Sequence, residues 1–482
     1  MQIPGVDFTE SFAPVASDTA IRVIIGVYLY YNKLNPRVDW VLEMFDVEAA
    51  FLNADLLQPS YIEWPQGVQE LGFISPEESK TTCVELTKAM YGNIDSPLRW
   101  MKTFTKHLVD TLKLVQSKSD PCIFYKHRQN KLVLVLALYV DDTLCAGEKG
   151  EVEWAYKVIE QRFAIKRLGK LKKHLGVNWT WHTDSKGEVY LKANINTMVT
   201  DISAKFLTAT GKLAKAYDTP ALPNSHLLKN TGEIVKLDYY RSLVGMLMYL
   251  TTKVYPELSN AVRELASHLA TPGNDHWKAL ERCIGYVSSV KDAGQVFRRP
   301  RELRSISDCD SNYARDENDR KSISGRINTL GGMITNWTSK KQSTVSLSST
   351  EAEYQALSEC VQEAMFTQSL IQELTGECNT AIIYEDNIGA IFLVKNQQVS
   401  ARTKHIDVRH HYMRDLHESK QIEVRFKRTD KNSSDILTKN TPKAIYEKHA
   451  SAIRDGTLSC WKEDVKADTS VIPLELKDEL SS

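Results

Sequence analysis

The sequence feature that most constrains the fold is an apolar run broken by two neighbouring aspartates. Leu132–Tyr139 is typical of a buried strand, and Val140, Asp141 and Asp142 separate it from a second short apolar run, Leu144–Ala146. A strand, two acids and a strand form a pattern typical of a β-hairpin. Because successive side chains of a strand point to opposite faces, we expect Asp141 and Asp142 to have different roles.

A second apolar segment, Val38–Val47, also predicts a strand, and Asp46 lies near its end. Two carboxylates about 4 Å apart repel each other by roughly 1 kcal/mol in water and about 4 kcal/mol at an effective dielectric near 20. Hard divalent cations such as Mg²⁺ reverse that sign, and two of them can activate an attacking hydroxyl and stabilise a leaving pyrophosphate. The alternative is structural, because Asp is common in hairpin turns and at helix N-caps, and the spacing alone favours this alternative.

Four further acids follow one another in the last third of the chain, each close to the end of an expected element: Asp310, Glu353, Asp386 and Asp435. Apolar residues at helical spacing predict a long helix over Glu351–Leu374, and a strand over Thr380–Tyr384 precedes a helix that begins at Asn387. Four carboxylates that converge can hold two Mg²⁺ ions, one polarising a water and one the leaving oxygen. That is the chemistry of phosphodiester hydrolysis.

Each of these acids also has a structural alternative. Thr350 and Glu353 fit a capping box, which would occupy Glu353 with the backbone. Asp386 and Asp435 fit as helix N-terminal acids favoured by the helix dipole. Asp308 lies two residues before Asp310 and competes with it as a ligand. The residues alone leave these alternatives open.

The composition excludes several classes of protein. The 482 residues carry 61 Lys and Arg against 61 Asp and Glu, with 42% hydrophobic residues, which excludes a wholly disordered chain and a bulk polycation. The longest apolar run, 132–140, is about half of what a membrane span needs, and we expect no signal peptide and no membrane partner. Eight scattered cysteines without a CxxC pair argue against a zinc ribbon or a disulfide scaffold and predict a protein that is not secreted.

Changes in patterning predict the domain organisation. Linker-like stretches lie at 217–237 and 291–304, and the segment between them, Tyr239–Val290, has helical spacing. Strands followed by crossover helices predict an α/β sheet domain in the last block. The chain after Pro442 has weak patterning, so we expect a frayed tail. The predicted domains are 1–215, 216–302, 303–441 and the tail, 442–482.

Several motifs of the first block resemble the reverse transcriptase of copia-type LTR retrotransposons: Gly5–Val15, Met44–Ala54, Tyr61–Gly67 and Leu138–Asp142. The resemblance implies that Asp46, Asp141 and Asp142 are the catalytic carboxylates of a polymerase. It makes Asp46 and Asp141 the main metal ligands and Asp142 a weaker contributor. The resemblance also implies that the dNTP site is lined by Ala49, Ala50, Phe51 and Tyr139.

Two positions in this region bear on the incoming nucleotide. Phe51 matches an aromatic that lies under the sugar in relatives and would exclude a ribonucleotide 2′-hydroxyl, although a core aromatic is an equal alternative. Asp95 stands where relatives have a Gln that contacts the nucleotide, and an acid there would repel a triphosphate unless its side chain turns away. The family's upstream segment that grips the triphosphate is absent, although Arg22 remains, so we expect a fragment of a longer polyprotein.

The last block resembles the ribonuclease H domain of the same family in Ser339–Leu357, Arg402–Asp407 and the segment around Asp435. The resemblance implies these catalytic metal ligands: Asp310, Glu353, Asp386 and Asp435. It favours Asp310 over Asp308 because the motifs that follow then align without gaps. A glutamate in second place suits ribonuclease H, whereas the retroviral-type integrase core has its glutamate last.

Two basic stretches are candidates for holding a nucleic acid backbone. Residues 402–431 contain nine Lys or Arg and five Asp or Glu, and nine minus five leaves +4. Lys166–Gly176 resembles the approach to the family's thumb and is unusually basic. Such phosphate contacts weaken steeply with salt. The alternatives are a solvated face for the first stretch and an exposed amphipathic helix for the second.

Together these features predict an α+β palm, fingers and thumb polymerase followed by an α/β ribonuclease H-like domain. The resemblance implies RNA-directed DNA polymerase and ribonuclease H activities, with two Mg²⁺ ions per site and Mn²⁺ as an alternative. The expected partners are dNTPs, an RNA template, a DNA primer, the RNA–DNA hybrid and the polyprotein's protease and integrase. The expected location is a cytoplasmic virus-like particle with nuclear access. The alternatives are a catalytically weak nucleic-acid-binding remnant and a nuclease without polymerase activity.

Overall fold

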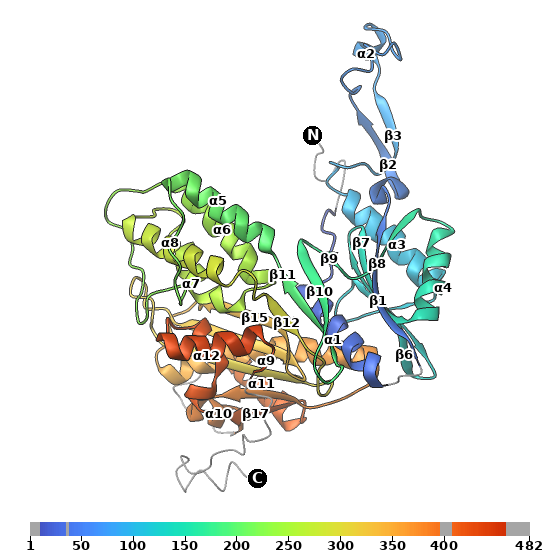
Figure 1. Cartoon of the computed structure of the whole chain (residues 1–482). Coiled ribbons are helices and arrows are strands. Elements are labelled where there is room, and N and C mark those ends of the chain that lie inside the picture. Colours follow the sequence, from blue (N-terminus) through green and yellow to red (C-terminus); the bar gives the residue numbers. More distant parts are fainter. Residues whose placement is uncertain (1–9, 35–37, 396–406, 459–482) are drawn as a thin grey trace. The chain divides into compact units, whose positions relative to one another are not determined.

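The computed structural model describes residues 10–34, 38–395 and 407–458 (Figure 1). As far as it is described, the chain divides into two compact units, one formed by residues 1–24 and 35–171 and the other by residues 25–34 and 172–482. The division falls inside helix α1 (Asp18–Leu34), so this helix contributes residues to both units. The predicted domain boundaries at 215, 302 and 441 stay predictions.

The first unit is built around an antiparallel sheet with the strand order β4-β5-β6-β7-β1-β8. β6 is buried along almost its whole length because its side chains are apolar on both faces, and it pairs with β7 as the predicted hairpin. β1 lies between β7 and β8, which places the strand that carries Asp46 beside that hairpin. Both sequence predictions are therefore confirmed. The strands are β1 (Trp40–Val47), β4 (Val115–Gln116), β5 (Ile123–Arg128), β6 (Lys131–Tyr139), β7 (Asp142–Glu148) and β8 (Ile165–Lys170).

Two longer helices support this sheet. α4 (Lys149–Glu160) packs against β7, β1 and β6. α3 (Ser96–Asp110) buries Trp100, Phe104 and Leu108, which share one face of the helix because they are four residues apart. A separate two-stranded ribbon and two short helices complete the unit: β2 (Asp55–Ile62), β3 (Val84–Lys88), α2 (Glu78–Thr81) and the 3₁₀ helix η1 (Ala50–Asn53).

The basic stretch Lys166–Gly176 is extended rather than helical. It forms β8 and β9 (Lys173–His174), so the alternative of an exposed amphipathic helix is wrong. β8 is an edge strand of the first sheet, and lysines suit such an edge because their charge discourages pairing with another chain. The basic side chains of this stretch are therefore arranged along strands and not on one face of a helix.

The second unit contains a sheet of order β12-β11-β10-β9 and a group of helices that pack on one another. α6 buries Tyr240, Leu243, Leu247 and Leu250 at helical spacing, which confirms the predicted helical middle block. The remaining elements of this region are β10 (Val177–Thr183), β11 (Val189–Asn194), β12 (Gln295–Phe297), α5 (Asn196–Thr210), α6 (Leu237–Lys253), η2 (Pro256–Leu258), α7 (Ser259–Ala266) and α8 (Asn274–Ser289).

The second unit also contains a mixed sheet of order β15-β14-β13-β16-β17. β13 pairs antiparallel with β14 and parallel with β16, so antiparallel and parallel pairings meet at the strand that carries Asp310. The long helix α9 packs against β13, β14 and β16 and shares a buried core with them. This is the predicted α/β domain. Its elements are β13 (Ser305–Asn312), β14 (Ile323–Leu330), β15 (Met333–Lys341), α9 (Ser349–Thr375), β16 (Ala381–Glu385), α10 (Ile388–Lys395), α11 (Asp407–Glu418), β17 (Ile422–Phe426), η4 (Thr429–Lys431) and η5 (Ser433–Leu437).

The chain after Pro442 is not frayed at its start, so that prediction is wrong for residues 443–454. They form α12 (Lys443–Arg454), which buries Tyr446, Ala450 and Ile453 on one face. The buried Glu257 receives a hydrogen bond from Arg454, and its carbonyl accepts one from the Tyr446 hydroxyl. Among the described residues, no helix combines the length and the apolar character that crossing a membrane requires.

Candidate active sites

The first acidic cluster lies where β1 meets the β6–β7 hairpin. Asp46 on β1 and Asp142 on β7 are register partners in the sheet. Asp141 lies at the hairpin tip, and its carbonyl oxygen accepts a hydrogen bond from the Val47 amide at 3.2 Å. All three side chains are partly exposed. The local pairing therefore brings the predicted acids Asp46, Asp141 and Asp142 to one end of the sheet.

The hairpin tip has a strained backbone that a buried indole holds. Val140 has a φ of 60°, a left-handed conformation that β-branched residues rarely adopt. Its carbonyl accepts a 2.7 Å hydrogen bond from Nε1 of Trp100, which is 1% exposed. Trp100 is thus a positioning residue for the acids beside Val140. Sequence reasoning missed it because the contact joins residues that are far apart in the chain.

The acids of this cluster affect one another electrostatically. Burial and the neighbouring charge of Asp141 raise the pKa of Asp46, while Lys166 lowers it. Burial, Asp141 and Asp46 raise the pKa of Asp142 in the same way. Lys166 on β8 is the register partner of Asp46. From the sequence, Lys166 was identified only as part of the basic stretch that resembles the approach to the thumb. A cluster in which carboxylates repel one another is suited to a bound cation.

The residues predicted to line a nucleotide site lie close by. Phe51 is half-buried, and its ring centroid is 4.6 Å from that of Tyr91, which is 53% exposed. Ala49 is exposed and Tyr139 partly exposed, whereas Ala50 is 1% exposed and offers little surface to a ligand. Their assignment to a nucleotide site stays a prediction.

Asp95 is buried and its negative charge is paired. It is 3% exposed and forms an ion pair with Arg99, one helical turn further along α3. The pairing follows from the i, i+4 spacing on a helix. The Asp95 side chain therefore turns away from solvent. Its charge is paired with that of Arg99, which weakens the expected repulsion of a triphosphate.

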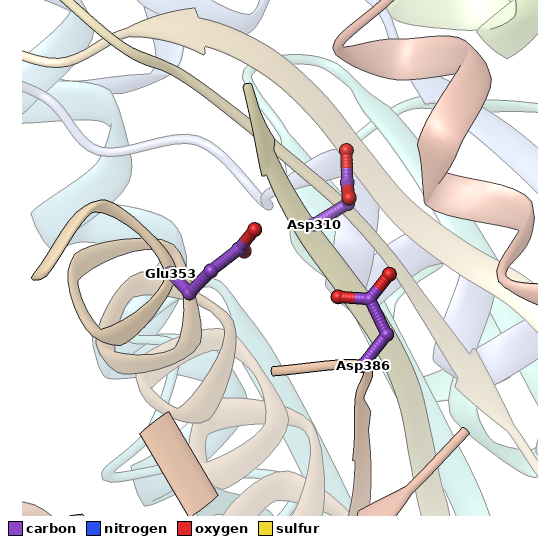
Figure 2. Close-up of side chains that lie close together, drawn as sticks. All are labelled: Asp310, Glu353 and Asp386. Atoms are coloured by element: carbon purple, nitrogen blue, oxygen red, sulfur yellow. The ribbon is translucent and has the colours of Figure 1, made fainter. Parts of the chain in front are cut away.

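The second acidic cluster lies in the mixed sheet of the second unit. Asp310 comes from β13, Glu353 from α9, and Asp386 directly follows β16. Each offers a carboxylate oxygen, and these oxygens lie within 4.8 Å of one another. Figure 2 shows the three side chains pointing toward a common space. Among the described residues, this is the group of acids with a geometry suited to one metal ion.

Glu353 has no structural partner that explains its burial. The α9 N-cap is Ser348, whose side chain accepts from the Glu351 amide, and Glu351 accepts from the Leu347 amide. The predicted capping box of Thr350 and Glu353 is therefore wrong, because the N-cap lies two residues earlier, at Ser348. Glu353 is 8% exposed, and its Oε2 has no hydrogen-bond partner among the described residues. Burial, followed by nearby carboxylates, raises the pKa of Glu353 to about 11.

Asp310 is fully buried beside the chain segment that carries Asp435. It accepts a hydrogen bond from the Thr438 hydroxyl and lies 3.4 Å from Nζ of Lys439. Burial raises the pKa of Asp310 to about 7, although Lys439 opposes this shift. Gly325 is the register partner of Asp310, and a Cβ there would lie 2.6 Å from the Thr438 side chain. The absent side chain lets the segment approach the strand closely.

Asp435 and Asp386 have different partners from those expected. Asp435 is 8% exposed and pairs with Lys439 at 2.6 Å, so it is not part of the group of three. Asp386 accepts a 2.6 Å hydrogen bond from the Thr429 hydroxyl. Asn387, and not Asp386, accepts from the Ala390 amide in the first turn of α10. Asp386 thus lies two residues before the helix, and the alternative that it is a helix N-terminal acid favoured by the dipole stays open.

Further buried charges surround this cluster, and sequence reasoning missed their roles. Asp308 pairs through both carboxylate oxygens, each at 2.7 Å, with Nζ of the buried Lys427, which excludes it as an available ligand. Glu385 is 0% exposed and accepts from the amides of Asp386 and Asn387, each at 3.0 Å. Burial raises the pKa of Glu385 well above its usual range. Glu385 thus fixes the backbone at Asp386 through these hydrogen bonds.

Some predicted motifs lie outside the described residues. These are the first part of Gly5–Val15 and residues 402–406 of the basic stretch. Of the second basic stretch, Arg167 forms ion pairs with Glu153 and Glu160, so its charge is already neutralised. The roles predicted for both stretches stay predictions.

Comparison with known proteins gives matches that cover most of the chain. Residues 1–211 match the family model described as reverse transcriptase (RNA-dependent DNA polymerase). The chain is 31% identical over 92% of its length to the retrovirus-related Pol polyprotein from transposon TNT 1-94 of Nicotiana tabacum. It is 30% identical over 92% and 94% to those from RE2 and RE1 of Arabidopsis thaliana. The matches cover 33%, 29% and 29% of these relatives, so the chain spans about a third of their length.

A comparison with solved structures gives a match over a smaller part of the chain. LC11-RNase H1, isolated from compost, matches 28% of this chain and 92% of its own at 14% sequence identity. The TM-score of this match is 0.23.

Proposed function

We propose that the chain is the polymerase and nuclease portion of a transposon Pol polyprotein. Residues 1–211 match the family model described as reverse transcriptase (RNA-dependent DNA polymerase), and the chain is similar over 92% of its length to such a polyprotein. The first unit would extend a primer with dNTPs on an RNA or DNA template. The second unit would cut RNA in an RNA–DNA hybrid. The observation that carries the first half is the register of Asp46 with Asp142 beside Asp141, within the matched residues.

In the proposed polymerase, the primer 3′-hydroxyl attacks the α-phosphate of a dNTP, a new P–O bond forms and pyrophosphate leaves. Divalent ions such as Mg²⁺, when bound, neutralise the charge that develops in this reaction. Asp46, Asp141 and Asp142 supply oxygen ligands of the kind that such ions prefer. Trp100 keeps the tip in position through the Val140 carbonyl. Phe51 and Tyr91 form the aromatic surface that we assign to the nucleotide.

In the proposed nuclease, Asp310, Glu353 and Asp386 hold a divalent cation. The fit rests on their spacing and on the buried Oε2 of Glu353 that lacks a partner. A bound ion supplies Lewis acidity for phosphodiester hydrolysis. Glu353 would hold the ion as a carboxylate, because carboxylate ligands bind metals in the ionised form. Glu385 keeps Asp386 in place through its two backbone amides.

The test is a double dissociation between two substitutions in the full chain. We expect Asp141→Asn to lower primer extension about 10²-fold or more while leaving cleavage of a labelled RNA–DNA hybrid unchanged. Glu353→Gln should lower hybrid cleavage by a similar factor while leaving primer extension unchanged. Both assays use the same preparations, so each activity is the folding control for the other.

Unchanged extension in Asp141→Asn would contradict the polymerase half, and unchanged cleavage in Glu353→Gln the nuclease half. Hybrid binding without dNTP incorporation by the unmodified chain would favour the weak nucleic-acid-binding remnant. That alternative was motivated by Asp95 and by the absent upstream segment of the fingers. The pairing of Asp95 with Arg99 weakens the first of these two arguments. Cleavage without extension would favour a nuclease alone.

The proposal also includes partners and location. The proposed substrates are dNTPs, an RNA template with a DNA primer, and the RNA–DNA hybrid. We assign the rest of a polyprotein, including a protease and an integrase, as the covalent context of the chain. A cytoplasmic virus-like particle with nuclear access is the proposed location.

A further inference from the structure

A lysine lies between two of the four acids that were expected to hold metal ions. Nζ of Lys439 is 2.6 Å from Oδ1 of Asp435 and 3.4 Å from Oδ1 of Asp310. The Lys439 side chain is 34% exposed, so most of it is buried with its two partners. An ammonium group thus occupies the space between Asp310 and Asp435.

The lysine is held there by its own segment of chain. Its amide donates to the Asp435 carbonyl at 3.1 Å, and the neighbouring Thr438 hydroxyl donates to Asp310. Gly325 lets this segment lie against β14, because any side chain there would overlap Thr438. Burial opposes the charge of Lys439, but Asp310 and Asp435 outweigh it and raise the pKa of Lys439.

The four acids therefore divide into two sets. Asp310, Glu353 and Asp386 have oxygens within 4.8 Å of one another, and the unpartnered Oε2 of Glu353 is available to an ion. Asp435 is neutralised by Lys439 and lies outside this set. A second divalent ion beside Asp435 would have to displace the ammonium or bear its repulsion at close range.

We infer that Lys439 serves as the second cation of this site, so that one divalent ion, held by Asp310, Glu353 and Asp386, completes it. The inference rests on the proposed nuclease function and changes the ion count predicted from the sequence from two to one. Lys439 then presents a fixed positive charge that can attract the phosphate of the hybrid. A preorganised charge of this kind stabilises developing negative charge without the cost of recruiting another ion.

The experiment counts Mn²⁺ ions bound to the full chain by isothermal titration and by electron paramagnetic resonance. All proteins carry Asp46→Asn and Asp141→Asn, so that ions of the first site are not counted. The number attributed to the nuclease site is the difference between this background and the same chain with Glu353→Gln. We expect that difference to be one. Lys439→Met should raise it to two, whereas Lys439→Arg should leave it at one.

Two further variants make the result decisive. Lys443→Met is the matched control, because Lys443 lies four residues further along and pairs with the exposed Asp218. It should leave the count at one. Asp435→Asn should also leave the count at one and change Mn²⁺ affinity less than threefold. This variant decides the matter if Lys439→Met does not fold.

Two ions in the background chain would overturn the inference, and so would a count of one in folded Lys439→Met. A loss of the ion, or a tenfold loss of affinity, in Asp435→Asn would overturn it as well. These outcomes leave the proposed nuclease intact as a two-ion site. If no Mn²⁺ depends on Glu353, the proposed nuclease function fails together with the inference.

Discussion

At the tip of the β6–β7 hairpin, the acids come from one hairpin and the strand beside it, and they are partly exposed to solvent. In the mixed sheet, Asp310, Glu353 and Asp386 come from two strands and a helix, and Asp310 and Glu353 are almost fully buried. Water can screen the first set of charges in the absence of ions. In the second set, Asp310 and Glu353 are protected from water and Asp386 is partly exposed, and burial raises the pKa of Asp310 and of Glu353.

This difference in burial shows how the negative charge of each cluster is balanced. At the hairpin site, Lys166 lies near Asp46, and hydrogen bonds from the Trp100 indole to the Val140 carbonyl and from the Val47 amide to the Asp141 carbonyl hold the tip. The buried site is surrounded by paired groups, with Lys439 between Asp310 and Asp435 and with Lys427 on Asp308. Buried charges must be paired or neutralised, because desolvation costs far more than it does at a surface.

After the two substitutions of proposed metal ligands described above, the largest effect is expected at Glu385, and it should affect the second site alone. Glu385→Ala removes the acceptor for the Asp386 and Asn387 amides, so hybrid cleavage should fall about 10- to 100-fold, the usual cost of losing a ligand's support. Glu385→Gln retains an accepting oxygen and should recover most of the activity. The measurements are kcat and the Mg²⁺ concentration for half-maximal cleavage, with primer extension as the internal control. An unaltered Mg²⁺ requirement in Glu385→Ala would show that this glutamate does not act through Asp386.

Alanine substitutions at two glycines, Gly147 and Gly325, should each lower the activity of one site only. A Cβ on Gly147 would lie 2.5 Å from the Val133 carbonyl oxygen, between β7 and β6, and one on Gly325 would lie 2.6 Å from Thr438. Overpacking costs about 1–3 kcal/mol, so Gly147→Ala should lower extension, and Gly325→Ala cleavage, by about tenfold. Each should spare the other activity.

The controls for this pair are Gly150→Ala and Gly245→Ala, since a Cβ at either position meets nothing within 4 Å. Both should leave extension and cleavage unchanged. Equal loss of both activities in Gly325→Ala would contradict the independence of the two sites.

A smaller effect is expected at the hairpin tip. Trp100→Phe removes the hydrogen bond to the Val140 carbonyl but keeps an aromatic ring beside Phe104. A lost hydrogen bond of this kind costs about 1 kcal/mol, so the rate of primer extension should fall about fivefold, with little change in hybrid cleavage. Steady-state kinetics of both activities test this. Wild-type extension by Trp100→Phe would mean that the strained tip needs no support from α3.

The smallest effect concerns acid stability and should touch only the second unit. Burial opposes ionisation of Asp316, but hydrogen bonds from Lys341 and Asn318 outweigh it and hold the pKa of Asp316 below its usual value. A lowered pKa stabilises the fold above the unfolded value of about 3.9, and the stabilisation is lost as pH falls below it. Asp316→Asn should therefore lower the free energy of unfolding by about 1–2 kcal/mol at pH 7. Denaturant titrations should show that this difference shrinks below about pH 4, and a constant difference would contradict the assignment.

Features that depend on residues close together in the chain could be predicted from the sequence. Apolar runs indicated β1, β6 and β7, helical spacing indicated α9, and the acids at the ends of these elements were identified from their positions. The basic strand β8 was not identified, because lysines at an exposed edge carry no apolar alternation. The groups that complete each site were also missed. Trp100 and Lys439 act through contacts with residues far away in the chain, which periodicity and capping rules do not report.

If the chain is part of a polyprotein, as proposed, its last described helix limits where a protease could release it. Arg454 neutralises Glu257, a carboxylate that is 1% exposed, and also donates to the Tyr286 hydroxyl at 2.7 Å. Leu458 is likewise 1% exposed. A protease that cut before Arg454 would leave Glu257 without its counter-charge in the interior, so a cleavage compatible with a stable product has to fall beyond residue 458.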